Sequence, residues 1–256
     1  MANSIRHLLV RVQNSLVNYL VTFGNSVNNS DIKLIRLGTF YGGWWIPKHV
    51  IEDRSISRVA LSIGIGHDVS FDKEILKSGF HVIALDPLAE CVSFARKELA
   101  DFSGVYLENL GLATFSGQER FYAPKTAAHD SWSSTNSQLT RFEESIIFEV
   151  ISLTDLLSKY ESNIEDSWTM LKMDIEGAES KIIPSLCDLG HSFDYVAIEM
   201  DFLSLIPFLQ LKTRLKRIKD ARDLLHKMDS RGYKLINYEN FNYFWSFEPN
   251  RHTRLE

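Results

Sequence analysis

The sequence contains few cysteines and no paired histidines. Cys91 and Cys187 are the two cysteines among 256 residues, and neither belongs to a Cys-x-x-Cys pair. Two isolated cysteines cannot build the disulfide framework of a small secreted domain or a thiolate metal site. None of the eight histidines forms a His-x-His or His-x-x-x-His pair, so we expect no zinc site. This pattern favours a reducing compartment, and we expect a cytoplasmic protein.

The sequence also lacks a long apolar run and a strong excess of charge. Arg11, Gln13, Asn14 and Asn18 interrupt the apolar residues near the N-terminus, so we expect neither a signal peptide nor a membrane span there. The formal net charge of -5 gives no general attraction to polyanions, and nucleic acid is not an expected partner. The 45% hydrophobic and 24% charged fractions are typical of a globular protein.

Apolar residues recur at helical spacing in the first 20 positions, which predicts an N-terminal helix. Such a helix could pack on the core, on a partner subunit as a homodimer contact, or on a membrane surface. Its polar face is poor in lysine, which makes the membrane the least expected of the three. The apolar residues are Ile5, Leu8, Leu9, Val12, Leu16 and Leu20.

We expect residues 1–50 to form this helix and an aromatic, glycine-rich lid, and residues 51–256 to form the main domain. The lid is Thr39-Phe40-Tyr41-Gly42-Gly43-Trp44-Trp45-Ile46-Pro47. Its glycines permit tight turns, while its tryptophans favour burial. Trp44 and Trp45 are therefore predicted to bind substrate as a pocket wall, with a cap over the sheet edge as the alternative.

From Ser57 onward, short β-branched or apolar runs alternate with helical stretches. This pattern predicts an α/β fold with a Rossmann-like, doubly wound and mostly parallel sheet. The last two runs flank Asn240 and predict a C-terminal antiparallel hairpin. The predicted strands are Val59–Ile63, His81–Leu85, Val105–Leu110, Ile146–Ile151, Met170–Met173, Tyr195–Glu199, Tyr233–Tyr238 and Phe241–Phe247.

The stretch from Ala113 to Ser145 departs from this alternation. Gly117 separates two short apolar segments, and a loop rich in serine and threonine follows. We predict a substrate-facing insertion here, in which His129 and Trp132 bind substrate.

The first predicted strand runs into a glycine turn, Gly64-Ile65-Gly66-His67-Asp68. Glycines let a ligand approach the backbone, and the amides of a helix start offer donors to a carboxylate or a ribose. A dinucleotide site would need a third glycine where Val69 stands, which argues against a dehydrogenase. The pattern therefore predicts a different nucleotide-type ligand.

Asp86 ends the next predicted strand, about 20 residues beyond the glycines. A carboxylate at that place can accept the hydroxyls of a ribose. The alternative is an ordinary helix cap before Leu88.

Two acids, Asp174 and Glu176, follow the apolar strand that ends at Met173. Ligands bind at the carboxyl ends of strands in open α/β sheets. The two carboxylates could meet an ammonium group, accept a proton from a substrate or bind a metal. A magnesium ion held with Glu199 or Asp201 stays an alternative, as does a charged loop that caps the next helix.

The block Lys172-Met173-Asp174-Ile175-Glu176-Gly177-Ala178-Glu179 resembles the signature of the FkbM-type methyltransferases, which is Lys-hydrophobic-Asp-hydrophobic-Glu-Gly-x-Glu. The glycine turn and the Asp86-Pro87 pair match the family in order and spacing, and the resemblance covers Thr39 to Phe247. It implies the class I methyltransferase fold, S-adenosyl-L-methionine (SAM) as cofactor, and O-methylation of a small metabolite, sugar or glycan.

The resemblance also implies roles for individual residues. Cofactor binding carries over to Gly64, Gly66, Asp68 and Asp86, and Asn109 and Leu110 fall where the adenine is usually framed. We interpret Asp174 as both cofactor-binding and catalytic, with Glu176 as the second catalytic residue and no metal.

Two alternatives from other classes stay open. The first is a SAM-binding or nucleotide-binding module without turnover. The second is an RNA methyltransferase that uses the basic run from Lys212 to Arg222, a run that otherwise fits the solvated face of an amphipathic helix. The Asp/Asn-Pro-Pro-aromatic tetrapeptide of many amino-methylating enzymes is replaced by Asp174-Ile175-Glu176-Gly177, which favours a hydroxyl or carboxyl oxygen as acceptor.

Overall fold

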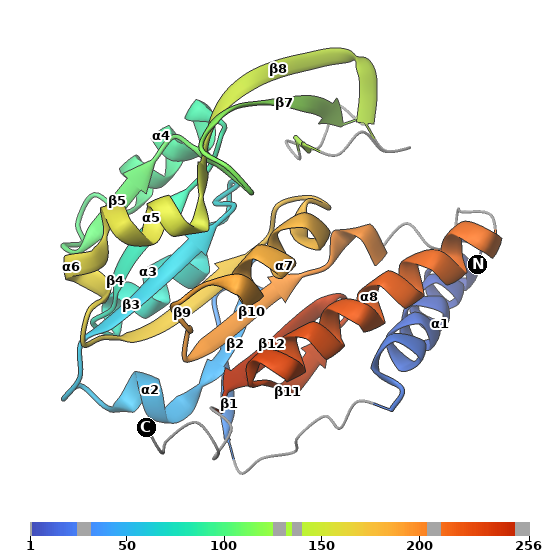
Figure 1. Cartoon of the computed structure of the whole chain (residues 1–256), viewed down its shortest axis with the longest axis horizontal. Coiled ribbons are helices and arrows are strands. Elements are labelled where there is room, and N and C mark those ends of the chain that lie inside the picture. Colours follow the sequence, from blue (N-terminus) through green and yellow to red (C-terminus); the bar gives the residue numbers. More distant parts are fainter. Residues whose placement is uncertain (1, 25–31, 125–131, 135–139, 204–210, 249–256) are drawn as a thin grey trace.

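A seven-stranded sheet lies at the centre of the chain (Figure 1). The computed structural model describes residues 2–24, 32–124, 132–134, 140–203 and 211–248. The strand order is β11-β12-β10-β9-β3-β4-β5, in which the five strands from β10 to β5 are parallel and the β11–β12 hairpin is antiparallel. The predicted mostly parallel sheet with a C-terminal hairpin is confirmed. The bounds are β3 (Arg58–Ile63), β4 (His81–Leu85), β5 (Val105–Glu108), β9 (Trp168–Met173), β10 (Tyr195–Glu199), β11 (Tyr233–Glu239) and β12 (Asn242–Phe247).

Helices cover both faces of this sheet because its strands are apolar on both sides. In β3, Leu61 and Ile63 contribute to the core under one face and Ala60 to the core under the other. The first face carries α5 (Leu153–Lys159), α6 (Glu161–Ile164), α7 (Glu179–Asp188) and α8 (Leu211–Arg231). The second carries α2 (Lys48–Glu52), α3 (Ser70–Lys77), α4 (Ala89–Glu98) and the hairpin of β1 (Leu34–Leu37) and β2 (Trp44–Pro47).

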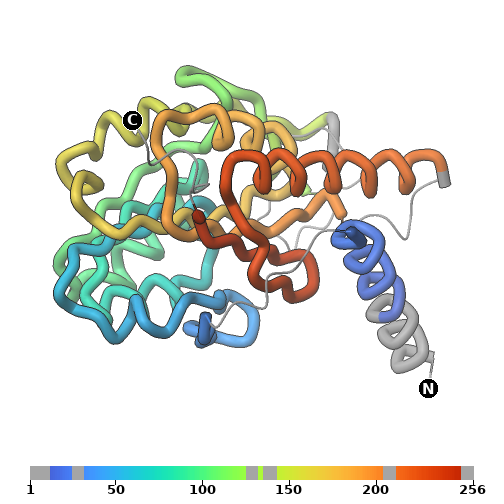
Figure 2. Tube along the Cα trace, turned by 60° about the horizontal axis from the view of Figure 1, so that its bottom comes forward, coloured from blue at the N-terminus to red at the C-terminus, as the bar shows by residue number. Residues whose placement is uncertain are grey.

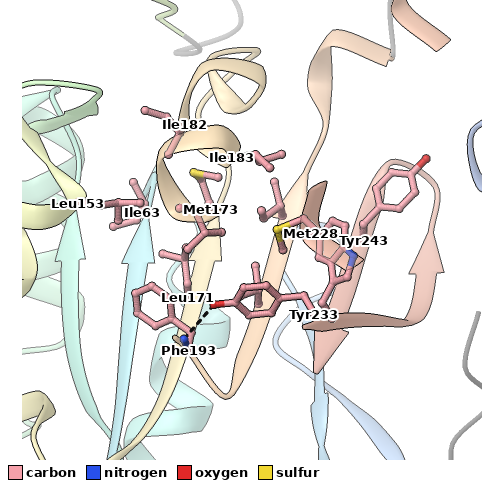
Figure 3. Packing of buried hydrophobic residues seen from close by; sticks show 14 of the residues in the cluster. Ile63, Leu153, Leu171, Met173, Ile182, Ile183, Phe193, Met228, Tyr233 and Tyr243 are labelled. Carbon is pink, nitrogen blue, oxygen red and sulfur yellow. Dashed lines mark hydrogen bonds between the residues drawn. The ribbon is translucent and has the colours of Figure 1, made fainter. Parts of the chain in front are cut away.

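The core under the first face contains the buried hydroxyl of Tyr233. Figure 3 shows Tyr233 pointing toward Phe193, whose backbone N–H donates to the tyrosine oxygen at 3.0 Å. Leu171 and Met173 from β9 pack in the same cluster. The hydrogen bond satisfies a phenol that would otherwise be buried without a partner, and so ties β11 to the start of β10.

The hairpin turn contains Asn240 and Phe241, since Glu239 pairs with Asn242. Asn240 has a left-handed backbone with φ of +54°, which asparagine tolerates better than most residues. The predicted tight turn is confirmed, and the last strand begins one residue later than predicted.

The N-terminal helix α1 (Ala2–Thr22) packs on this hairpin. Val17 and Val21 are buried in the core, and the side chain of Asn18 donates to the carbonyl of Asn240. The hydroxyl of Tyr243 donates to the Asn18 side-chain oxygen at 2.7 Å. None of the helices in the described ranges is long and apolar enough to cross a bilayer.

A second, three-stranded sheet occupies the predicted insertion. Its order is β6-β8-β7, and the bounds are β6 (Gly111–Ala113), β7 (Gly117–Pro124) and β8 (Thr140–Ser152). The predicted strand Ile146–Ile151 lies within β8 and so belongs to this sheet, because β8 pairs with β6 and β7 rather than with the central strands. The predicted strand from Val105 ends at Glu108, before the chain turns into β6.

Candidate functional site

The loop after β3 turns through two glycines with left-handed backbone. Gly64 has φ of +80° and Gly66 has φ of +57°, which residues with a side chain rarely adopt. A Cβ on Gly64 would lie 1.8 Å from the carbonyl oxygen of Asp174, so the loops after β3 and β9 touch only because this side chain is missing. A Cβ on Gly66 would meet no heavy atom within 4 Å. The turn is therefore close-packed at Gly64 and open at Gly66.

Asp86 holds the glycine turn in place from the end of β4. One carboxylate oxygen accepts the backbone N–H groups of Ile65 and Gly66, both at 3.0 Å, and the other accepts that of Leu88 at 2.8 Å. The carboxylate is buried, and this burial raises its pKa, although the three amides act in the opposite direction. A carboxylate offers about four acceptor positions. Three are taken here, which leaves one for a ligand.

Asp68 connects the glycine turn to the loop between β1 and β2. It accepts from the hydroxyl of Thr39 and from the backbone N–H of Ser70. A Cβ on Gly42 would lie 2.5 Å from the Asp68 carboxyl carbon, so this loop lies directly against the acid. Burial acts to raise the pKa of Asp68, but the hydrogen bonds from Ser70 and Thr39 keep it below its usual value.

Lys172 is a buried cation beneath the site. It faces away from the Leu171 and Met173 side of β9, and its Nζ donates to the carbonyl of Gly64. The same ammonium lies 5.4 Å from the ring centroid of Trp44, a distance at which the ring face attracts a cation. Lys172 therefore fixes the glycine turn to β9 and supplies one positive charge among several carboxylates.

Carboxylates gather where β9 and β10 end. Ligand atoms of Asp174, Glu176 and Asp201 all lie within 4.8 Å of one another, which would suit a metal ion or an ammonium group. Glu199 is the last residue of β10, and repulsion from the nearby Asp174 and Glu176 acts to raise its pKa. Burial raises the pKa of Asp174, Glu199 and Asp201, and mutual repulsion raises the last two further.

The loop between β9 and α7 has an unusual backbone. Glu176 has φ of +56° without being glycine, and the hydroxyl of Ser133 donates to its carbonyl at 2.7 Å. Glu179 is fully buried and accepts the N–H groups of Ile175 and Gly177 through one oxygen. Burial raises the pKa of Glu179 to about 8. A residue that its neighbours hold in such a rarely populated backbone conformation is found mainly at ligand sites.

These raised carboxyl pKa values predict a pH dependence of stability. The pKa of Glu199 is raised from 4.5 to about 8, first by burial and then by repulsion from Asp174 and Glu176. Between these values the folded chain holds a proton that the unfolded chain has released, so stability is complete at low pH and is lost as the pH rises through the folded pKa. We expect the free energy of unfolding in urea to fall between about pH 4.5 and about pH 8.

The variant Glu199→Gln should reduce this loss by about 3 to 5 kcal/mol, because glutamine cannot release a proton. The exposed Glu90 offers a matched control, and Glu90→Gln should leave the pH slope unchanged. An unaltered slope in Glu199→Gln would contradict the assignment of the titrating group.

The glycine turn, Asp86 and the loop after β9 line one cavity of about 350 Å³. It lies above the carboxyl ends of β3, β4 and β9, and it also contacts the second sheet through Phe121. The packing of Trp132 against Phe148, at 6.1 Å between ring centroids, anchors its wall. The predicted site residues that line it are Trp44, Gly64, Gly66, Asp68, Asp86, Leu110, Trp132, Asp174 and Glu176.

Two of the predicted site residues that the structure describes do not line this cavity. The indole of Trp45 donates to Glu239 at 2.9 Å, on the other side of β2 from Trp44, because neighbouring strand residues face opposite ways. Asn109 lies behind the wall, where its amide donates to the carbonyls of Asp86 and Pro87. His129 lies outside the described residues.

Several residues of the site were not assigned a role from the sequence. Lys172 belongs to the acidic block, and its place in an apolar strand is a sequence signal for a buried cation. Tyr41, Phe121 and Ser134 also line the cavity. They come from separate segments, so their proximity depends on the tertiary fold.

Comparison with protein families identifies one match. The family model described as Methyltransferase FkbM domain matches residues 58–235. This range includes the glycine turn, Asp86 and the acidic block. No curated protein matches the sequence.

Comparison with solved structures found similar chains at low sequence identity. A protein described as a caffeoyl-CoA O-methyltransferase from Staphylococcus aureus is 12% identical, with a TM-score of 0.43 over 78% of this chain and 80% of that chain. The fibrillarin pre-rRNA processing protein of Methanococcus jannaschii is 10% identical, with a TM-score of 0.38 over 88% and 86% of the two chains.

Proposed function

Because the chain belongs to the FkbM methyltransferase family, whose methyl donor is SAM, we propose that it methylates a hydroxyl or carboxyl oxygen of a small molecule, sugar or glycan. The observation that carries this proposal is the cavity between the glycine turn, Asp86 and the acidic cluster. A nucleoside end and a cationic end of a ligand would find complementary residues there.

The residues of the cavity fit SAM. The open side of Gly66 leaves room for close approach, and the remaining acceptor position of Asp86 suits a ribose hydroxyl. Leu110 supplies an apolar contact for the adenine. Asp174 and its neighbouring carboxylates would bind the methionyl ammonium, since opposite charges attract strongly in a site shielded from water. A cavity of about 350 Å³ lies within the range of small-molecule sites.

Bound SAM supplies a methyl group activated by a positively charged sulfur, and the chain must align an acceptor oxygen with it. Alignment alone can account for a large share of such an acceleration. The acceptor hydroxyl must also lose its proton. Asp174 and Glu176 line the cavity and are the proposed bases, and the raised pKa of Asp174 makes it a stronger base than an ordinary carboxylate.

Aromatic rings line the part of the cavity that we assign to the methyl acceptor. Trp44 and Trp132 line the cavity from two different segments, and flat rings of this kind suit the apolar face of a sugar or another ring. An RNA acceptor is disfavoured, because Asp174, Glu176 and Asp201 would repel phosphate groups at the same end of the sheet.

The test is methyl transfer from isotopically labelled SAM to a panel of sugars, hydroxy acids and RNA, followed by mass spectrometry. We expect a labelled product among the sugars or acids. Treatment with base then distinguishes a carboxyl acceptor from a hydroxyl acceptor. The methyl ester formed on a carboxyl is hydrolysed, and the methyl ether formed on a hydroxyl is not. Labelled RNA would replace the proposed acceptor class, and SAM binding without any product would favour a module without turnover.

Asp86 provides a binding prediction. In Asp86→Asn the one amide oxygen can still accept from Ile65 and Gly66, but the charge offered to the ribose is lost. A hydrogen bond to a charged group contributes about 1.5 to 3 kcal/mol, so SAM affinity should fall by about ten-fold or more. Calorimetry measures this, with Asp188→Asn at the exposed end of α7 as the control. Equal affinity in Asp86→Asn and the wild type would remove Asp86 from the site.

A further inference from the structure

Over residues 12–22, where its side chains are described, helix α1 has two apolar faces, and one of them is left uncovered. Val17 and Val21 point into the core. Val12, Leu16 and Tyr19 recur at spacings of four and three residues, and Phe23 continues the same series just past the helix. All four side chains are more than half exposed. At about 3.6 residues per turn they form a stripe on the side of the helix opposite to Val17 and Val21.

The helix that carries this stripe lies next to α8. Figure 2 shows residues 12–22 of α1 leaning outward from the body beside α8. The guanidinium of Arg222 donates to the carbonyl of Phe23 at 3.2 Å, so the two helices meet there. Lys219 and Leu215 precede Arg222 by one and two helical turns and share its side of α8. Leu215 is also more than half exposed.

The charge around the stripe is strongly positive. Between Leu211 and Arg222, α8 carries six lysines and arginines and the single acid Asp220, although the whole chain has a net charge of -5. Lys212, Lys216 and Lys219 are exposed, and Lys219 forms an ion pair with Asp223 at 3.7 Å. Helix α1 contains no acidic residue. We call the exposed stripe of α1 and the basic side of α8 the α1–α8 surface.

We propose that the α1–α8 surface binds the headgroup region of an anionic lipid membrane. The polar face of α1 alone is poor in lysine, which disfavoured a membrane contact from the sequence, but α8 supplies the exposed lysines beside it. Apolar side chains on one side of a helix enter the boundary between headgroups and acyl chains, and lysines nearby contact anionic headgroups. A second copy of the chain is the less favourable occupant, because a symmetric contact would place two strongly basic surfaces against each other. The binding is peripheral, and it does not depend on which acceptor is methylated.

Sedimentation with lipid vesicles tests this proposal on the full chain. We expect binding to vesicles made of equal parts phosphatidylcholine and phosphatidylglycerol to exceed binding to pure phosphatidylcholine by about ten-fold or more, and to weaken with added salt. Leu16→Glu, and separately the double variant Lys212→Glu with Lys216→Glu, should each lower the partition coefficient by about ten-fold. Urea unfolding of each variant establishes that it is folded.

Phe115 provides the matched control. It is exposed in the turn before β7, away from the α1–α8 surface, so Phe115→Glu should not alter vesicle binding. Three results would overturn the proposal. These are equal binding to both vesicle types, equal binding by the wild type and the folded α1–α8 variants, and a concentration-dependent dimer that binds no vesicles and that Leu16→Glu converts to a monomer.

Discussion

Replacing Gly66 by valine is expected to abolish SAM binding while the protein still folds. A Cβ at this position meets no atom of the protein within 4 Å, and Gly66 lines the cavity that we assign to the cofactor, so we expect the added side chain to occupy space that SAM needs. The left-handed backbone, with φ of +57°, makes valine unfavourable by about 1 to 2 kcal/mol. Domains of this size are usually stable by about 5 to 15 kcal/mol, so the fold should survive. Calorimetry with SAM and urea unfolding measure the two effects.

Gly64 in the same turn gives the matched contrast. A Cβ there would lie 1.8 Å from the carbonyl oxygen of Asp174, so even Gly64→Ala must push the loops after β3 and β9 apart. We expect it to lower the free energy of unfolding by about 3 kcal/mol or more. The two glycines should thus differ in kind, with a steric block to the ligand at Gly66 and a loss of stability at Gly64. Retained SAM affinity in folded Gly66→Val would contradict the glycine-turn assignment.

The central strands could be predicted from the sequence because their burial leaves a local signal. His81–Leu85 and Tyr195–Glu199 were predicted with their observed bounds. Both are short runs with buried residues on both faces of the sheet, a pattern that surface segments seldom show. Their parallel direction follows because βα units place consecutive strands in parallel.

The two smaller sheets could not be assigned in the same way. The strand around Ile146 was recognised, but Ile146 and Ile147 are each about half exposed, and nothing in the segment says which strand it pairs with. Of the β1–β2 hairpin, the turn and β2 were predicted only as part of an aromatic lid, and β1 was not predicted. Both strands are four residues long, which is too short for a clear alternation of apolar and polar residues. Both small sheets depend on how distant segments pair, which no local sequence pattern shows.

The candidate site could be predicted where its glycine and acidic residues directly follow the ends of strands. Gly64, Asp86 and Asp174 each follow directly on an apolar strand, and the parallel sheet brings those ends together. The contacts that hold these residues in place could not be predicted. The hydroxyl of Ser133 reaches the carbonyl of Glu176 from 43 residues away, and no local pattern encodes such a contact. Trp44 and Trp45 are adjacent in sequence, yet they diverge because the strand places them on opposite faces.

Asp174→Asn is expected to lower turnover by about 100-fold or more at saturating SAM if Asp174 accepts the acceptor's proton. Asparagine keeps the size of the side chain but removes its charge, so it cannot take up a proton. The backbone N–H of residue 174 would still donate to the carbonyl of Ile63 at 3.0 Å, which should preserve the loop. The measurement is the rate of methyl transfer with the acceptor found in the labelled-SAM screen, with Asp188→Asn as the control outside the cavity.

The same variant separates two roles of Asp174. If the carboxylate only binds the methionyl ammonium, Asp174→Asn should weaken SAM affinity, and raising the SAM concentration should restore most of the rate. If it is the base, saturating SAM restores nothing, because the lost interaction acts on the transition state. Glu176→Gln extends the comparison to the second carboxylate of the cluster, whose ligand atoms lie within 4.8 Å of those of Asp174. Full activity in both variants would show that neither carboxylate is the base and that the proton leaves by another route.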